Sequence, residues 1–346
     1  IMGLLKKFFS KTKEENKTNY HVSFQEEFYT PPSAFSNISN KEELFNAVHP
    51  FSYTEFINYN PNYKLTEEQK IVAFLSWCNK TKQPIKSNDK YPYRLSYLLR
   101  IDDLSGFHNS LIENGYLKKA DVEYSLSKLT IKELKEILDK YNISVKGKKS
   151  DYVNAILNSV DVNTLQLTNY YELTEKGKNL LSTKDNKEFI VAFENRYGVS
   201  LAEFYNVKKY LNKHLTPNDI LWQILLAKYD YEKLDNCYFL ARNALLNQAY
   251  LLQDEEKYIA ALEHYIYVAY FDLSGCCNNC IEEKERALIA PAIVEFIQKY
   301  KDYYVDKIMD RCTRLGLPHH YYSIEEFDAI IKSIMDNNEY YKQFIS

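Results

Sequence analysis

Apolar residues recur every three or four positions along most of this chain, the spacing that gathers side chains on one face of an α-helix. The segment 66–77 is a clear case, because Thr66 and Gln69 also match the capping box that opens many helices. Gly and Pro, the residues that interrupt helices, number only 8 and 9 in 346 residues. The pattern therefore predicts a mainly helical protein.

The region after this helix combines short helices with two short strands. Helices are predicted over 94–101 and 104–114, and Gly115 is expected to end the second one. Residues 116–119 form one strand candidate, and a second strand begins at Tyr170 and runs into a helix capped by Thr174. Residues 120–169 lie between the two strands.

The two ends of the chain differ in pattern. Residues 11–64 are polar but carry aromatic residues, which disordered tails usually lack, so this arm is expected to pack against something. These aromatic residues are Phe24, Phe28, Tyr29, Phe35, Phe45, Phe51, Tyr53 and Phe56. From about residue 189 onward, helices are predicted over 201–213, 217–228, 235–252, 255–272, 281–300, 302–315 and 323–335.

Composition narrows the class of protein. No run approaches the roughly 18 to 20 apolar residues that a membrane span needs. Six cysteines in so long a chain do not form the framework of a small disulfide-rich secreted protein. Residues 2–10 are apolar and basic but lack the apolar core and the cleavage site of a secretory signal. We expect a cytoplasmic protein that makes no membrane contact.

One segment departs from the chain's overall charge of −3. Residues 128–149 hold seven lysines against three acidic residues, a local charge of +4. The lysines are Lys128, Lys132, Lys135, Lys140, Lys146, Lys148 and Lys149. A positive footprint on a mildly acidic chain indicates a docking surface for phosphate groups.

The same segment predicts two helices joined by an extended turn. Thr130 is the expected N-cap of the first helix, assisted by Glu133. The chain turns at Gly147, and a second helix begins at Lys149 or Ser150. A helix N-terminus offers free N–H groups and the positive end of its dipole to a phosphate, and glycine permits close backbone approach.

These residues resemble a SAP motif, a short helix-extended-helix module found in many DNA-associated proteins. The matching positions are Leu129, Leu134, Leu138, Val145, Gly147, Lys148, Lys149, Val153, Ile156 and Leu157. The resemblance implies that the turn and the start of the second helix lie against duplex DNA. It assigns this contact to Lys146, Gly147, Lys148, Lys149 and Ser150, and the basic face of the first helix adds Lys132 and Lys135.

Two further resemblances concern the flanks of this module. Two helices, a strand and a second strand leading into Thr174 resemble the back half of a winged-helix domain, with residues 120–169 in place of the wing tip. An ordinary α+β module with a two-stranded ribbon would give the same pattern. Downstream, one helix pair resembles a tetratricopeptide unit, but no second unit aligns, so an irregular helical-repeat bundle is predicted. The pair is carried by Ala249, Leu252, Tyr258, Ala261, Tyr265 and Val268.

The predicted architecture is therefore mainly α and multi-domain. It comprises an aromatic-containing arm over 1–64, a winged-helix-like α+β domain over 65–185 with the SAP-like module at 126–160, and an all-helical, repeat-like domain over 186–346.

Other chemical motifs carry less weight. Cys276, Cys277, Cys280 and Cys312 offer thiolates for zinc, but their spacing lacks the two close ligand pairs of a structural zinc site, so no cofactor is predicted. No Gly-x-Ser-x-Gly motif, glycine-rich phosphate loop or His-x-x-x-His pair occurs, so no enzyme activity is predicted. The aromatic residues in 265–271 and 300–304 fit either core packing or a groove for a protein partner.

The sequence favours a non-enzymatic DNA-binding accessory or scaffold protein, by analogy one of a bacterium or a mobile element. The turn lacks the Arg or Asn fork that discriminates bases, so contact with double-stranded DNA is expected to follow the phosphate backbone with little sequence preference. The alternative is a protein–protein adaptor whose helical half binds a partner and whose SAP-like module is only a spacer.

Overall fold

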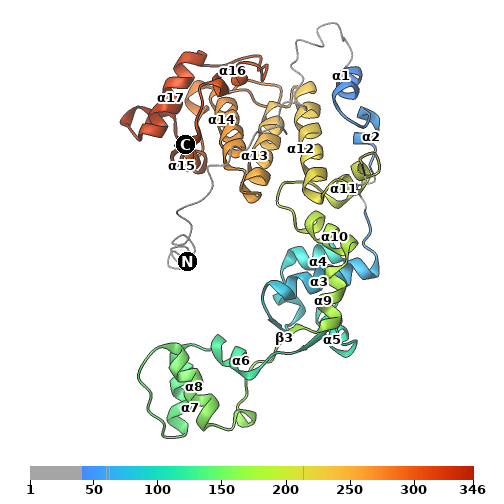
Figure 1. The fold of residues 1–346 in the computed structure, drawn as a ribbon, viewed down its shortest axis with the longest axis vertical. Coiled ribbons are helices and arrows are strands. Elements are labelled where there is room, and N and C mark those ends of the chain that lie inside the picture. Colours follow the sequence, from blue (N-terminus) through green and yellow to red (C-terminus); the bar gives the residue numbers. More distant parts are fainter. Residues whose placement is uncertain (1–40, 60, 62, 213) are drawn as a thin grey trace.

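The computed structural model describes residues 41–59, 61, 63–212 and 214–346, and helices predominate among them. Figure 1 shows three parts arranged along the long axis of the molecule. We call them the helical body (residues 41–58 and 195–346), the sheet body (65–119 and 170–194) and the inserted module (120–169). No helix in the described residues is long and apolar enough to cross a membrane.

The sheet body encloses a small three-stranded sheet. Its elements are α3 (Glu67–Lys80), β1 (Gln83–Pro84), α4 (Tyr93–Leu99), α5 (Leu104–Glu113), β2 (Leu117–Lys119), β3 (Tyr170–Leu173), α9 (Glu175–Ser182) and α10 (Lys184–Glu194). The strand order is β1-β3-β2 and both pairings are antiparallel. Leu117 lies opposite Leu173, so the two strands predicted on either side of residues 120–169 do pair.

Local sequence signals account for the ends of these elements. Thr66 and Gln69 form the predicted capping box at the start of α3. Gly115 adopts φ +72° after α5, a left-handed conformation that favours glycine. Phe74 and Leu75 of α3 are fully buried in a core that also contains Leu117. This core positions the ribbon from which the inserted module extends.

The inserted module has a hydrophobic core of its own. It consists of α6 (Val122–Lys128), α7 (Ile131–Lys140) and α8 (Lys149–Ser159). The buried residues are Leu126, Leu134, Leu138, Tyr152, Val153, Ile156 and Val160. The Ala120 amide donates a hydrogen bond of 2.8 Å to the Tyr170 carbonyl, just beyond the last strand pair. Figure 1 shows the module at the end of the molecule opposite the helical body.

The helical body contains the remaining α-helices. They are α1 (Lys41–Val48), α2 (Tyr53–Ile57), α11 (Leu201–Lys208), α12 (Pro217–Leu234), α13 (Tyr238–Asp254), α14 (Tyr258–Ser274), α15 (Pro291–Tyr300), α16 (Lys307–Thr313) and α17 (Ile324–Asp336). Its short 3-10 helices are η5 (Lys284–Arg286), η6 (Lys301–Tyr303) and η7 (Glu339–Phe344), whereas η3 (Asn88–Lys90) belongs to the sheet body and η4 (Val162–Thr164) to the inserted module. The helices α13 and α14 pack along each other, and the small residues Ala249 and Ala261 are fully buried.

The described part of the predicted arm belongs to the helical body. Phe45, Phe51 and Phe56 are buried in a core shared with α11 and α12. Tyr53 packs against the same core, whereas Phe24, Phe28, Tyr29 and Phe35 lie outside the described residues.

The helix predicted over 281–300 is wrong in its first half. Gly275, at φ +71°, ends α14, and Cys276 then forms an antiparallel bridge with Ile281. The Ile289 amide donates to the Phe344 carbonyl at 2.8 Å, so contact with the C-terminal segment holds this stretch extended. The helix begins only at Pro291, whose missing N–H is tolerated in the first turn.

Two other predicted helices are shorter in the structure. The helix predicted over 201–213 ends at Lys208, and the one predicted over 302–315 is confined to Lys307–Thr313. Helix α10 was not predicted, and it crosses the expected domain boundary at residues 185–186. Its Phe189 packs in the sheet body, whereas Ala192 packs in the helical body.

Candidate nucleic-acid interface

The first lysine-bearing helix of the inserted module begins as predicted. Thr130 Oγ1 accepts a hydrogen bond of 3.2 Å from the Glu133 amide, and the Glu133 carboxylate accepts one of 2.6 Å from the Thr130 amide. The bond from the Thr130 amide is the main reason that the pKa of Glu133 lies below its usual value. Leu134 and Leu138 are buried on the inner face of α7, so its lysines face solvent.

The turn between the helices depends on Gly147. Its φ of +150° is a conformation that side chains rarely adopt. A Cβ at this position would also lie 2.1 Å from Oδ2 of Asp151. The same Oδ2 accepts a hydrogen bond of 2.7 Å from the Lys148 amide. The backbone conformation therefore favours glycine here, and a larger residue would also push the Asp151 carboxylate away from the Lys148 amide.

Contacts between α7 and α8 show that the two helices run in the same direction. Lys149, at the start of α8, lies near Glu133 at the start of α7 and helps to lower the pKa of that carboxyl group. Two or three residues further along both helices, Lys135 Nζ lies 5.6 Å from the ring centroid of Tyr152. The positive ends of both helix dipoles therefore face the same end of the module.

The structure brings most of the predicted contact residues together at this end. Lys146, Gly147, Lys148 and Ser150 are all exposed, and we call these four residues the basic turn. Within the part of the chain that the structure describes, the amides of Lys149 and Ser150 have no protein acceptor. Lysine ammonium groups and free amides together form a surface that suits phosphate oxygens.

The other three predicted lysines have different surroundings. Lys149 is half-buried, and its Nζ donates a hydrogen bond of 2.6 Å to the Ser127 carbonyl, which ties α8 to α6. Lys132 has an 87% exposed side chain whose Nζ lies 3.9 Å from Glu136, a pairing too open to hold it. Lys135 lies over the ring of Tyr152. Lys132 and Lys135 remain available as a flank of the basic turn, whereas Lys149 is structural in part.

Asp151 is the residue at this site that the sequence analysis missed. Its carboxylate accepts the hydrogen bond of the Lys148 amide, so this amide is not free to bind a phosphate. The signal was the three-residue spacing of a capping box, which is hard to recognise when lysine instead of Ser or Thr stands at the N-cap.

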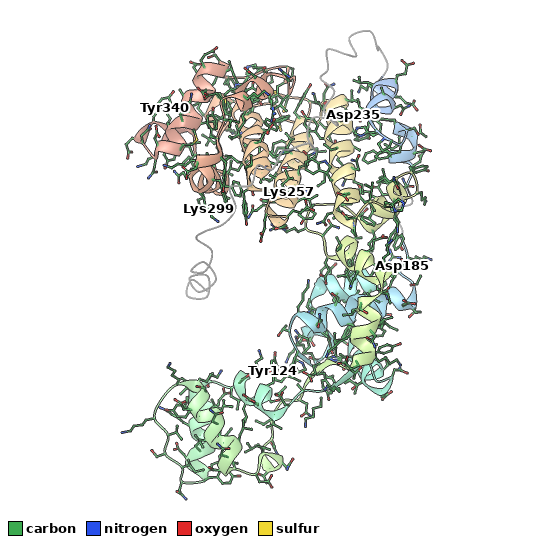
Figure 2. The ribbon with its side chains drawn as sticks, viewed as in Figure 1. Tyr124, Asp185, Asp235, Lys257, Lys299 and Tyr340 are labelled. Carbon is green, nitrogen blue, oxygen red and sulfur yellow. The ribbon has the colours of Figure 1, made fainter. Side chains whose placement is uncertain are left out.

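A cluster of aromatic and charged residues joins the inserted module to the ribbon, and Figure 2 marks Tyr124 there. The Tyr124 ring packs edge-on against Tyr170, with centroids 5.4 Å apart. Lys82 Nζ and Lys128 Nζ lie 4.7 and 4.5 Å from the centroid of the Tyr124 ring. Helix α6 was not predicted, although Asp121 supplies an N-cap three residues before Tyr124.

The same lysine, Lys82, also binds the ribbon. Its Nζ lies 2.6 Å from Glu172 of β3, and Lys118 of β2 contacts the same carboxylate at 3.3 Å. The hydrogen bond from Lys82 is the main cause of the lowered pKa of Glu172. The positive charge of these two lysines is thus partly balanced within the ribbon.

The cysteines considered for zinc occupy contrasting environments. Cys312 is fully buried in the core of the helical body, and burial raises its pKa well above the usual value. Cys277 and Cys280 lie at a turn where the Cys277 amide donates to the Cys280 carbonyl at 2.9 Å. Among the described residues, no three His, Cys, Asp or Glu side chains gather into a group that could hold a metal ion.

Comparison with known families bears on the inserted module. The family model of the SAP domain matches residues 125–158, which include the end of α6, all of α7, the basic turn and nearly all of α8. SAP domains are generally DNA-binding modules. No match to the chain is found among curated proteins or among solved structures. The chain therefore contains a SAP domain within a larger architecture.

Proposed function

We propose that this chain is a non-enzymatic DNA-binding accessory or scaffold protein, in which the SAP domain contacts the phosphate backbone of duplex DNA. The observation that carries the proposal is the basic turn. It places two exposed lysines beside free amides at the end of the module where both helices begin. The position of the module at one end of the molecule leaves this surface clear of the two larger bodies.

The chemistry of the basic turn supports binding with little sequence preference. Its side chains are those of lysine and serine, which hold phosphate oxygens without the bidentate geometry that discriminates bases. We propose that affinity arises mainly from release of counterions.

The topology of the sheet body supports a winged-helix-like architecture as part of this proposal. Three helices and three strands follow each other in the order α3, β1, α4, α5, β2, β3. In the sheet, β3 lies between the other two strands. The module then occupies the position of the wing tip. Helix α5, the second helix of the pair before β2, contains no Lys or Arg, so we assign the DNA contact to the SAP domain instead.

The adaptor function has one observation in its favour. Phe239 and Leu240, neighbours at the start of α13, are 50% and 41% exposed, which places two large apolar side chains at the surface of the helical body. In the adaptor hypothesis this surface binds a partner and the SAP domain holds no nucleic acid.

Binding of random-sequence duplex DNA as a function of salt separates the two hypotheses. We expect the affinity of the unaltered protein to fall steeply between about 50 and 200 mM salt. The variant Lys146→Gln with Lys148→Gln should reduce the log–log salt slope by about 1.8, because each neutralised phosphate contributes about 0.9. Lys149 is left unchanged, because its bond to the Ser127 carbonyl supports the fold.

A matched control removes two exposed lysines elsewhere. Lys184→Gln with Lys187→Gln changes net charge equally on α10 of the sheet body and should leave the slope unchanged. No salt-dependent binding by the unaltered protein, or equal losses in both double variants, would favour the adaptor.

A further inference from the structure

A second cationic site lies where the sheet body meets the helical body, away from the SAP domain. It is a cavity of about 680 Å³ whose lining includes Tyr63, Lys64, Arg100, Tyr205 and Lys209. Its volume falls within the range of about 300 to 1,000 Å³ that is usual for small-molecule sites. None of the residues that line it carries a carboxylate.

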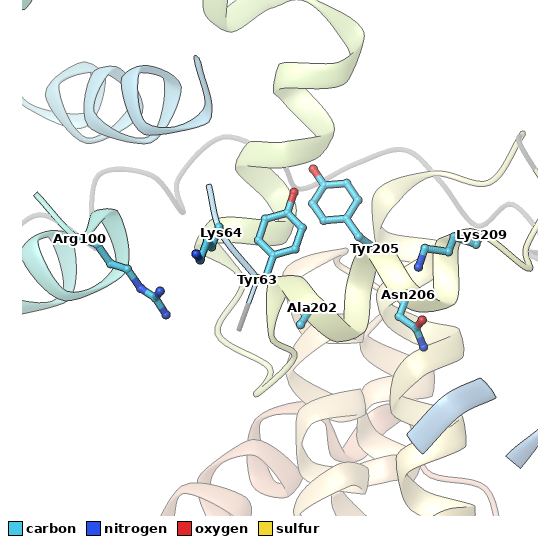
Figure 3. Close-up of a pocket in the computed structure, with 7 residues that line it drawn as sticks. All are labelled: Tyr63, Lys64, Arg100, Ala202, Tyr205, Asn206 and Lys209. Atoms are coloured by element: carbon cyan, nitrogen blue, oxygen red, sulfur yellow. The ribbon is translucent and has the colours of Figure 1, made fainter. Parts of the chain in front are cut away.

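Three cations from separate elements surround this cavity. Lys64 belongs to the segment before α3, Arg100 follows α4, and Lys209 follows α11. Figure 3 shows Arg100 and Lys64 directed toward each other on one side of the tyrosines, with Lys209 reaching in from the other side. All three side chains are exposed, and no ion pair to an acidic residue is formed by any of them in the described part of the chain.

Helix capping accounts for only part of this arrangement. Cations are favourable at helix C-termini, which suits Arg100 and Lys209. Lys64 instead lies two residues before the N-cap of α3, where the helix dipole disfavours positive charge. Arg100 also adopts φ +52°, a left-handed conformation that is unusual for a residue with a side chain.

Two tyrosines form an aromatic wall of the cavity. The rings of Tyr63 and Tyr205 are stacked, with centroids 5.3 Å apart and planes inclined by 9°. Gln69 Nε2 donates a hydrogen bond of 3.0 Å to the Tyr63 hydroxyl, which holds that ring in place. Burial raises the pKa of Tyr205, so its hydroxyl stays protonated and adds no negative charge.

Of the two acidic groups that influence this wall, the stronger one is already neutralised. Glu188 influences Tyr205, but its carboxylate forms an ion pair with Lys208. Asp185 contributes more weakly to the same hydroxyl. The cavity therefore combines three cations lacking acidic partners with a neutral aromatic surface.

We propose that this cavity binds a phosphate-bearing ligand of nucleotide size. The cations hold the phosphates, and the tyrosine wall packs against the base or sugar. A free nucleotide and the terminal nucleotide of an unpaired strand share this chemistry. The site is independent of the basic turn and of the proposed function of the SAP domain.

Calorimetric titration of the full chain with adenosine triphosphate and with a short oligothymidylate distinguishes these two sources. We expect at least one of them to bind. The variant Lys64→Gln, Arg100→Gly, Lys209→Gln should weaken that binding by about tenfold or more, because it removes the three cations that hold the phosphates. A tenfold loss of affinity corresponds to about 1.4 kcal/mol. Glycine suits the left-handed backbone at position 100, so the end of α4 is preserved.

A control with three other exposed cations changes the net charge equally. Lys90→Gln, Lys307→Gln, Arg314→Gln should bind as the unaltered protein does, and so should the double variant of the basic turn. The variant Lys64→Gln with Lys209→Gln, which leaves Arg100 in place, guards against a folding defect. Failure of both ligands to bind the unaltered protein, or equal weakening in the control, would overturn the proposal.

Discussion

At the basic turn, a single carboxylate sets the conformation of the backbone. The Asp151 carboxylate accepts a hydrogen bond from the Lys148 amide. It also occupies the space that a Cβ on Gly147 would need. The glycine that would allow close approach to DNA in the proposed function is thus also favoured by the fold of the module. A substitution of Gly147 therefore affects the stability of the module as well as any binding to it.

We predict that Gly147→Ala destabilises α8 by about 1 to 3 kcal/mol, because it combines backbone strain with a clash. Hydrogen exchange of the α8 amides measures this loss locally. In an Asp151→Ala background the clash is absent, so the added cost of Gly147→Ala should shrink. An equal cost in both backgrounds would show that the carboxylate is not the obstacle.

A buried histidine in the sheet body, His108, should make the stability of the protein depend on pH. His108 is fully buried, its Nδ1 lies 3.0 Å from the Tyr91 hydroxyl, and its Nε2 has no hydrogen-bond partner among the described residues. Burial lowers the pKa of His108 to about 4. In the unfolded chain the value is about 6.5.

The free energy of unfolding should therefore fall as the pH drops from about 6.5 to about 4. The unfolded state takes up the proton below about pH 6.5, whereas folded His108 resists it until about pH 4. His108 alone contributes a loss of about 2 kcal/mol between about pH 7.5 and pH 5. Urea unfolding of His108→Gln should show a shallower pH dependence, whereas His214→Gln, at an exposed position, should match the unaltered protein.

At the scale of elements, the ribbon and the inserted module are separable. The last residue pair of strands β2 and β3 before the module is formed by Lys119 and Tyr171. The hydrogen bond from the Ala120 amide to the Tyr170 carbonyl extends this pairing by one more position. The module supplies its own core, from Leu126 in α6 to Val160 after α8. The geometry is that of a hairpin whose turn has been replaced by a domain.

Replacement of residues 121–169 by Asn-Gly should therefore leave the sheet body folded. A two-residue Asn-Gly turn suits antiparallel strands that are already in register. We expect thermal unfolding of the remaining chain to change by only a few degrees, of the order of 1 kcal/mol, and duplex binding to be lost. Retained duplex binding would assign the DNA contact to another part of the chain.

At the scale of the whole molecule, two bodies share a continuous hydrophobic interior and the SAP domain stands apart. Helix α10 places Phe189 in one core and Ala192 in the other, and Leu201 and Tyr205 contact both. The hydrophobic cluster of the SAP domain includes none of these residues. This arrangement agrees with the proposed scaffold function, in which the SAP domain binds nucleic acid at one end of the molecule and the helical body binds a partner.

Much of the local structure follows from residues close together in sequence. The capping boxes at Thr66 and Thr130, the end of α5 at Gly115 and the apolar face of α7 were all predictable, because each depends on contacts within one or two helical turns. The loop before Pro291 was not predictable in this way, because its conformation depends on a bond to Phe344, more than fifty residues away.

The sequence by itself determined the mainly helical class, the SAP domain and the lysines that surround its turn, since periodicity and charge are properties of neighbouring residues. Only the tertiary structure decided which cations are free. It ties Lys149 to the Ser127 carbonyl, leaves Lys146 and Lys148 exposed, and gathers Lys64, Arg100 and Lys209 around one cavity. The physical reason is that burial and hydrogen bonding depend on neighbours in space, which the chain brings together only when it folds.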